Sequence, residues 1–167
     1  DLIIFMGNRF LWGFMAALVI WVSIFAVVYF FFASAQAPIV AMVNTDSVEK
    51  EIVIPRSKDG HYYVRGKING YPVDFMVDTG ASVVSISYDL ARSIHLPRGA
   101  PANFSTAGGN MIGEVVSAID IEVGNIRLGE LTVSVGIQGN IALLGQNFLR
   151  RIDVIQSDDK MILRIRN

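Results

Sequence analysis

The alternation of apolar and polar positions divides the chain into two parts. No charged residue occurs from Phe10 to Thr45, and Leu11 to Ala33 form a nearly unbroken apolar run, LWGFMAALVIWVSIFAVVYFFFA. Because about 20 apolar residues in a helix are enough to cross a bilayer, this run predicts a transmembrane helix over residues 11–35. Beyond residue 50, short apolar runs alternate with breaks that contain Gly, Asn and Pro, which is typical of strands and turns.

A cleaved signal peptide is the alternative interpretation of the apolar run. The sequence ASAQA, residues 33–37, has small residues spaced as at a cleavage site, and Arg9 would supply the basic flank. The run is longer than the roughly 7–15 apolar residues of a signal peptide, which favours an uncleaved anchor in the lipid bilayer. Arg9 on one side and Lys50 as the first basic residue on the other favour a C-terminal domain outside the cytoplasm, on the periplasmic side.

The flanking segments complete the predicted domain organisation. Residues 1–10 contain a second apolar stretch, LIIFM, and we interpret them as the N-terminal flank or the end of an earlier membrane segment. Residues 36–50 are expected to form a linker, and residues 51–167 a single domain with one core.

Strand patterns dominate the predicted domain. The runs HYYVRGKI and YPVDFMV flank Asn69 and Gly70, and Asn-Gly between two such runs is the strongest short-range hairpin signal. Ser87 is a suitable N-cap for a helix over residues 88–96, and the region rich in Gly, Ser, Asn and Pro at 97–110 predicts a loop. Further strands are expected at 51–56, 83–87, 111–124, 126–137, 141–145 and 160–166, with a helical segment at 146–152. The pattern indicates an all-β, barrel-like domain with one or two short helices.

Composition and charge exclude several classes of function. The 167 residues are 52% hydrophobic, and residues 47–167 carry thirteen acidic and thirteen basic side chains. No basic run is interleaved with aromatic residues, so we do not expect a nucleic-acid partner. The chain has no cysteine, and His61 and His95 are not spaced as metal ligands. GGNMIG lacks the context of a dinucleotide fingerprint, so neither a metal nor another cofactor is expected.

One acidic residue stands out by its position. The apolar strand that ends at Val77 is followed directly by Asp78-Thr79-Gly80-Ala81-Ser82 and then by another apolar strand. Asp and Gly are ordinary turn residues, so a turn without function in a β-rich domain is one interpretation. A carboxylate placed for reaction is the other. Asp74, Asp120 and Asp153 are interpreted as solvent-facing.

Two motifs in order carry a resemblance to a known family. VDTGAS at residues 77–82 and ALLGQNFL at residues 142–149 resemble the two motifs of the retropepsin-like aspartic proteases. Residues 60–87 and the TAGG at 106–109 are similar to the bacterial, membrane-anchored branch. The resemblance covers about residues 50–167 and implies a retropepsin-like closed barrel of double-psi type. Its second motif is carried by Leu143, Leu144, Gly145, Gln146 and Asn147.

The chemistry of such a motif requires two carboxyl groups. Cleaving an amide without a metal or a nucleophile takes one carboxylate to activate water and a carboxylic acid to polarise the carbonyl. The chain has one Asp-Thr-Gly, and about 120 residues cannot hold two such lobes. Asp78 is therefore expected to face Asp78 of a second copy across a two-fold axis, which makes the protein a homodimeric endopeptidase acting on polypeptides.

Neighbouring residues are assigned supporting roles. Gly80 would allow the two turns to approach, Thr79 would bond across the interface as the resemblance implies, and Ser82 would orient the outer carboxylate oxygen. An ordinary turn hydroxyl is the alternative for both Thr79 and Ser82. Residues 104–116 form a candidate flap that closes over substrate, with its tip and substrate contacts at Thr106, Ala107, Gly108, Gly109 and Asn110.

One departure from the retroviral members concerns the second motif. They carry an Arg that pairs with an Asp following their Asp-Thr-Gly-Ala, whereas this chain has Gln146 and has Ser82 and Val83 after the motif. Both partners of the ion pair are absent, so neither is left buried and unpaired. A non-proteolytic peptide-binding module on the same fold is the alternative function.

Overall fold

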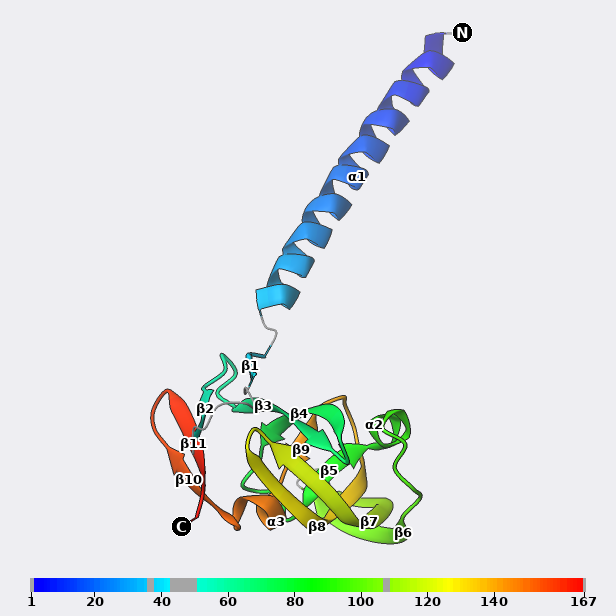
Figure 1. The fold of residues 1–167 in the computed structure, drawn as a ribbon. Coiled ribbons are helices and arrows are strands. Elements are labelled where there is room, and N and C mark those ends of the chain that lie inside the picture. The colour runs from blue at the N-terminus through cyan, green and yellow to red at the C-terminus, as the bar shows by residue number, and fades with distance from the viewer. Residues whose placement is uncertain (1, 36–37, 43–50, 107–108, 167) are drawn as a thin grey trace. The chain divides into compact units, whose positions relative to one another are not determined.

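The protein divides into two compact units, residues 1–37 and 38–167, which are described separately. The computed structural model describes residues 2–35, 38–42, 51–106 and 109–166 (Figure 1). The predicted linker, 36–50, is therefore described only at residues 38–42, where Val40–Ala41 form a short strand, β1.

The first unit contains helix α1, Leu2–Ala35, which confirms the predicted helix. Its span from Trp12 to Ser34 has a mean hydropathy of 2.5, and none of it is buried. The hydroxyls of Ser23 and Ser34 donate to the carbonyls of Val19 and Phe30, one turn earlier, at 2.8 and 2.7 Å. These hydroxyls thus find partners within the helix itself, as a lipid environment requires. The length and composition of this span suit a membrane anchor or a signal sequence.

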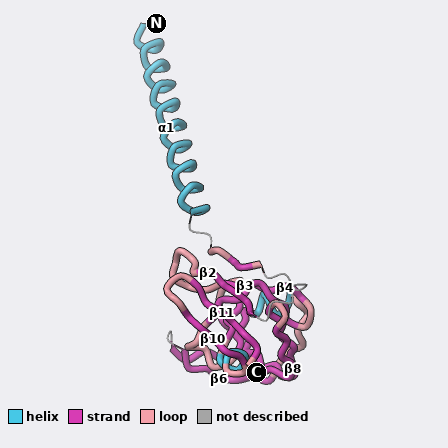
Figure 2. The backbone as a smooth tube through the Cα atoms, turned by 60° about the vertical axis from the view of Figure 1, so that its left-hand side comes forward, coloured by secondary structure: helices cyan, strands magenta, loops and turns pink. Residues whose placement is uncertain are grey.

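The second unit is built almost entirely from strands (Figure 2). The larger sheet has the order β1-β3-β4-β9-β5-β8-β7-β6, and an additional pairing of β3 with β7 joins six of its strands in a ring. A smaller sheet has the order β10-β11-β2. The strand bounds are β2 Glu51–Pro55, β3 Tyr63–Ile68, β4 Tyr71–Val77, β5 Val84–Ser87, β6 Ala100–Thr106, β7 Gly109–Val123, β8 Ile126–Ile137, β9 Ala142–Leu144, β10 Ile152–Gln156 and β11 Lys160–Ile165.

Both sheets contribute to one hydrophobic core. Inward positions alternate along β4, where Val73, Phe75 and Val77 are buried. From the smaller sheet, Ile54 and Leu163 join the same cluster. A shared core of this kind keeps the strand ends of the larger sheet in fixed relative positions, which the site described below depends on.

Local sequence signals account for the β3–β4 hairpin. Asn69 and Gly70 both have positive φ, 48° and 85°, as a two-residue turn of the primed type requires. The Asn69 side chain also accepts a hydrogen bond from the Asp120 amide at 2.9 Å, which ties the turn to β7. The predicted hairpin is confirmed.

The helices of this unit are short. Helix α2 spans Tyr88–Ser93, and Ser87 caps it by accepting from the Leu90 amide at 3.2 Å, as predicted. It ends before residue 96 because His95 takes a φ of 57° and the Leu96 amide turns back to the Ala91 carbonyl at 2.9 Å. Helix α3 covers only Gln146–Leu149.

Two predictions made from local sequence were wrong or incomplete. The predicted loop at 97–110 is wrong for Ala100–Thr106, which form β6. Pro101 is accommodated because β6 ends the strand order and pairs only with β7 among the described strands. An edge strand tolerates proline, since the missing N–H can face away from the neighbouring strand. The helical segment predicted at 146–152 is wrong for Ile152, which begins β10, and this strand is not predicted.

Candidate active site

The candidate site lies where two neighbouring loops of the larger sheet cross. Strand β9 lies between β4 and β5, parallel to β4 with Val77 opposite Leu144, and antiparallel to β5. The loop that joins β4 to β5, residues 78–83, therefore has to pass over the end of β9. The Asp78 amide donates to the Leu144 carbonyl at 3.2 Å, which fixes the start of this loop.

Gly145 makes the crossing possible. A Cβ atom at this position would lie 2.3 Å from the Val83 carbonyl oxygen and 2.4 Å from its carbon. The next two amides bind the loop above, with Gln146 donating to the Ala81 carbonyl at 2.8 Å and Asn147 to the Ser82 carbonyl at 3.1 Å. The requirement for glycine in the second motif thus follows from two backbones in contact.

The Asn147 side chain joins helix α3 to two strands at this crossing. Its Oδ1 accepts from the Val84 amide at the start of β5 at 3.0 Å, and its Nδ2 donates to the Thr132 carbonyl of β8 at 2.7 Å. Each end of the amide group thereby satisfies a backbone group that lies beside the site.

The Asp78 carboxylate is held by its own turn. The Gly80 amide donates to Asp78 Oδ1 at 2.8 Å, and the Thr79 carbonyl of the same peptide group accepts from Gln146 Nε2 at 2.9 Å. Asp78 is half-buried, whereas Thr79, Gly80 and Ser82 are exposed. A Cβ at Gly80 would lie 3.2 Å from Asp78 Oδ1, so a side chain there crowds the carboxylate even within one copy.

A cleft of about 380 Å³ opens beside this carboxylate. Among the described residues that line it, Asp78 is the only acid. Phe104 and Ser105 from β6 and Met111 from β7 contribute to its walls, so the candidate flap and the Asp78 turn share one cleft. Of the predicted flap residues, Thr106 ends β6, Gly109 and Asn110 begin β7, and Ala107 and Gly108 lie outside the described residues.

Sequence reasoning missed part of the cleft lining, namely Val83, Ser85, Ser134 and Ile137. Ser134 donates to Ser85 Oγ at 2.8 Å, and Ser85 donates to the Val83 carbonyl at 3.1 Å, which places two buried hydroxyls in the cleft. Ile137 and Leu143 add apolar surface. Of these, Leu143 was assigned to the second motif, while the others occupy ordinary strand positions, so only the three-dimensional pairing shows that they face Asp78.

The other acids considered in the sequence are engaged in ion pairs. Asp74 binds Arg65 at 2.7 Å, and Asp153 binds Arg164 and Arg166 at 3.4 and 3.2 Å. The hydrogen bond to Asp74, followed by its charge, raises the pKa of Arg65. These interactions agree with the interpretation of both acids as surface residues rather than a second catalytic group.

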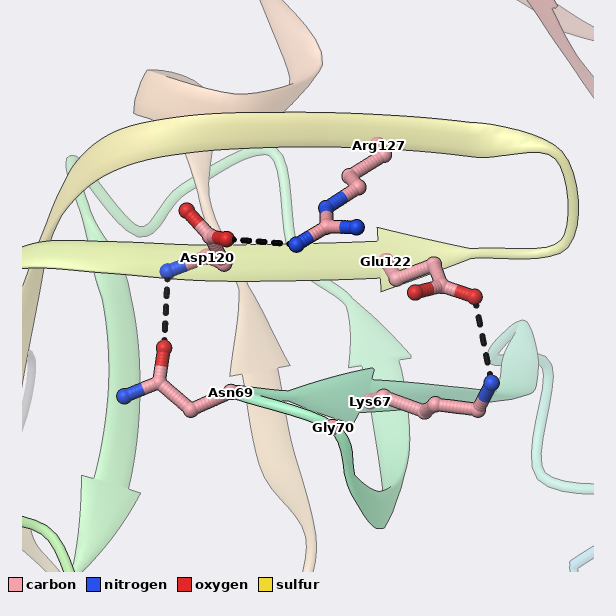
Figure 3. Close-up of a pocket in the computed structure, with 6 residues that line it drawn as sticks. All are labelled: Lys67, Asn69, Gly70, Asp120, Glu122 and Arg127. Carbon is pink, nitrogen blue, oxygen red and sulfur yellow. Dashed lines mark hydrogen bonds and ion pairs between the residues drawn. The ribbon is translucent and has the colours of Figure 1, made fainter.

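A second hollow of similar volume is not a comparable site. It is lined by Lys67, Asn69, Gly70, Asp120, Glu122 and Arg127 (Figure 3). Lys67 pairs with Glu122 at 3.1 Å and Arg127 with Asp120 at 2.8 Å, so the charges neutralise one another. The hydrogen bond to Asp120 also raises the pKa of Arg127. The residues around this hollow connect the β3–β4 turn to β7, and we interpret their interactions as structural contacts.

Another polar contact involves Asp59 and Tyr63. The Tyr63 hydroxyl donates to Asp59 Oδ2 at 2.6 Å. Burial, and then this hydrogen bond, raises the pKa of Tyr63 to about 12. The same hydrogen bond is the main cause of the lowered pKa of Asp59. Neither residue lines the Asp78 cleft. Over the described part of the chain, no three His, Cys, Asp or Glu side chains are grouped to hold a metal ion.

Comparison with known proteins places this geometry in context. A profile of the family described as "gag-polyprotein putative aspartyl protease" matches residues 64–151. The crystal structure of a retropepsin-like aspartic protease from Rickettsia conorii is similar with a TM-score of 0.61 and 27% sequence identity, over 69% of this chain and 90% of that one.

Two curated relatives are uncharacterized proteins. The uncharacterized protein in the cobV 5′ region of a Sinorhizobium species is 30% identical to this chain over 134 residues, which are 74% of this chain and 56% of the relative. One from Rickettsia prowazekii is 28% identical over 124 residues, 68% of this chain and 50% of the relative. The chain thus spans about half the length of the curated relatives that it matches.

Proposed function

We propose that this chain, which belongs to the gag-polyprotein aspartyl protease family and has a retropepsin-like fold, is an aspartic endopeptidase that acts as a homodimer. One observation carries the proposal. Asp78 projects from the end of β4 into a cleft where it is the only acid among the lining residues that the structure describes, and its Oδ1 is held by the Gly80 amide at 2.8 Å.

The proposed reaction uses two carboxyl groups and one water molecule. The ionised carboxyl takes a proton from the water as the water oxygen attacks the carbonyl carbon, and the protonated carboxyl gives its proton to the carbonyl oxygen. Proton transfer to the amide nitrogen then accompanies breakage of the C–N bond. Two carboxyls close together share one proton, so we expect activity at acidic to mildly acidic pH.

The second carboxyl is assigned to Asp78 of another copy. The acids at positions 74, 120 and 153 are paired with arginines, and none of them lines the cleft. Exposure of Thr79, Gly80 and Ser82 leaves the turn accessible to a partner. In this arrangement Thr79 bonds to the partner's backbone, Gly80 and Ala81 allow the two turns to meet, and Ser82 orients the outer carboxylate oxygen.

The remaining assignments concern the substrate. The β6–β7 hairpin, with residues 106–110 at its tip, acts as a flap that excludes water from the cleft. Residues 143–147 hold the turn through backbone hydrogen bonds. An extended polypeptide lies in the cleft and pairs with strand edges, while the apolar side chains Met111, Ile137 and Leu143 select among substrate residues.

The N-terminal helix is proposed to anchor the enzyme. Residues 11–35 cross the bilayer, residues 36–50 link the anchor to the protease domain at 51–167, and the domain lies on the periplasmic side. The span of 23 residues with a mean hydropathy of 2.5 supports the anchor, and Arg9 on its N-terminal side supports the orientation.

A direct experiment compares the full chain in detergent micelles with its Asp78→Asn variant on a peptide library. The wild type should cleave at acidic pH and Asp78→Asn should not. Equal cleavage by both would refute the assignment of Asp78. No cleavage by a wild-type dimer would instead support a peptide-binding module.

A further inference from the structure

A single peptide group at the active-site turn is held at both of its ends. The Gly80 N–H points at Asp78 Oδ1, and the Thr79 C=O of the same peptide plane points at Gln146 Nε2, with donor–acceptor distances of 2.8 and 2.9 Å. The carboxylate and the Gln146 side chain are therefore linked through one rigid plane, although Thr79 and Gln146 lie 67 residues apart in sequence.

The orientation of the Gln146 side-chain amide follows from the group that it contacts. A backbone carbonyl only accepts hydrogen bonds, so the nitrogen of the Gln146 side chain has to face Thr79. The backbone of Gln146 is also fixed, because its own amide donates to Ala81 at 2.8 Å and Gly145 lies in contact with Val83. The Gln146 side chain thus contacts the turn from a backbone that is itself held in place.

We propose that Gln146 is a positioning residue for the catalytic carboxylate, a role that rests on the proposed function. Its amide fixes the orientation of the Thr79–Gly80 peptide and polarises it, which strengthens the Gly80 N–H as a donor to Asp78 Oδ1. The hydrogen bond to Oδ1 thereby fixes the orientation of the carboxylate that exchanges protons with water and with the partner carboxyl.

Few charges act on this linkage. Arg150 Nε donates to the Gln146 backbone carbonyl at 3.2 Å, and the Asp78 carboxylate lies at the other end. Gln146 therefore contributes a neutral donor at the position where the retroviral members have an Arg. It takes no part in an ion pair with the turn, and acts on its backbone instead.

The kinetic test uses Gln146→Met, which keeps the length of the side chain but removes the donor, with Gln156→Met on exposed β10 as the matched control. Loss of one hydrogen bond predicts a fall in kcat of roughly 3- to 10-fold with KM changed less than about 2-fold. Gln156→Met should behave as wild type. A change confined to KM, or an unchanged kcat, overturns the proposal.

The pH profile separates positioning from a general structural effect. In Gln146→Met the weaker Gly80 donor leaves the carboxylate less stabilised, so activity relative to wild type should fall as pH decreases. Gln146→Glu should do the opposite, because a protonated Glu regains a donor to the Thr79 carbonyl at low pH. If the activity of each variant relative to wild type does not vary with pH, the proposal is contradicted.

A spectroscopic measurement tests the linkage without catalysis. In the full chain labelled with 15N-glycine in micelles, the Gly80 amide proton should move upfield in Gln146→Met and stay in place in Gln156→Met. An unmoved Gly80 resonance overturns the positioning role even if activity is lost. If Asp78→Asn cleaves as well as wild type, the proposed function fails, while the Gly80 resonance still decides whether Gln146 acts on the turn.

Discussion

Asn147 is the side chain whose loss should weaken the active-site crossing most clearly. In Asn147→Leu, a side chain of similar size loses both hydrogen bonds, to the Val84 amide at 3.0 Å and to the Thr132 carbonyl at 2.7 Å. Val84 is fully buried, so water cannot replace the lost partner of its amide. An unsatisfied buried group costs about 1–3 kcal/mol, and the two together predict a loss of about 2–6 kcal/mol.

The assay has to report on the β-rich unit alone. Both tryptophans, Trp12 and Trp21, lie in α1, so tryptophan fluorescence does not follow unfolding of the strands. Urea titration of the full chain in micelles, followed by pulsed hydrogen exchange and mass spectrometry of residues 126–149, gives the required free energy of unfolding. Asn103→Leu on the exposed face of β6 is the control and should change stability by less than about 0.5 kcal/mol. If Asn147→Leu also falls within that limit, the reasoning about the crossing is refuted.

Three further predictions concern the crossing, a buried phenol and the cleft. Gly145→Ala should lose about 3 kcal/mol or more in the same titration, since its Cβ would meet the Val83 carbonyl at 2.3 Å; a loss below about 1 kcal/mol would mean that the backbones separate easily. Tyr63 contributes stability that is complete below its unfolded pKa of 10.0 and is lost as pH rises toward about 12, because its pKa is raised in the folded state. Tyr63→Phe should lack this alkaline decline, and an identical decline in both proteins would contradict the assignment. Met111→Ser, which shortens an apolar wall of the cleft, should raise KM for peptides with large apolar residues by about tenfold; an unchanged KM would remove the β6–β7 hairpin from the substrate site.

The sequence predicts those elements that are governed by neighbouring residues. Asn69 and Gly70 identify the hairpin because few other pairs adopt positive φ at two successive positions. Ser87 identifies a helix start through its own hydroxyl. Asp78 stands out because an apolar strand ends in a carboxylate, and it lies within the residues matched by the family profile, 64–151.

Features that depend on residues distant in sequence could not be predicted from neighbouring residues. Strand β6 contains Pro101 and looks like a loop until its pairing with β7 and its place at the end of the strand order are known. Ser85 and Ser134 resemble any strand positions, yet their hydroxyls meet at 2.8 Å in the cleft. The contact of Gln146 with Thr79 was also not foreseen, because it arises only when the second motif passes beneath the first.

The central claim is that one active site needs Asp78 from two copies of the chain. It is tested by co-expressing wild type with Asp78→Asn, measuring their ratio by mass spectrometry, and assaying cleavage at constant total protein. If each site needs both carboxyls, activity should follow the square of the wild-type fraction, so that an equal mixture of freely assorting copies keeps about a quarter of full activity. Activity proportional to the wild-type fraction, with about half remaining in the equal mixture, would contradict the shared site.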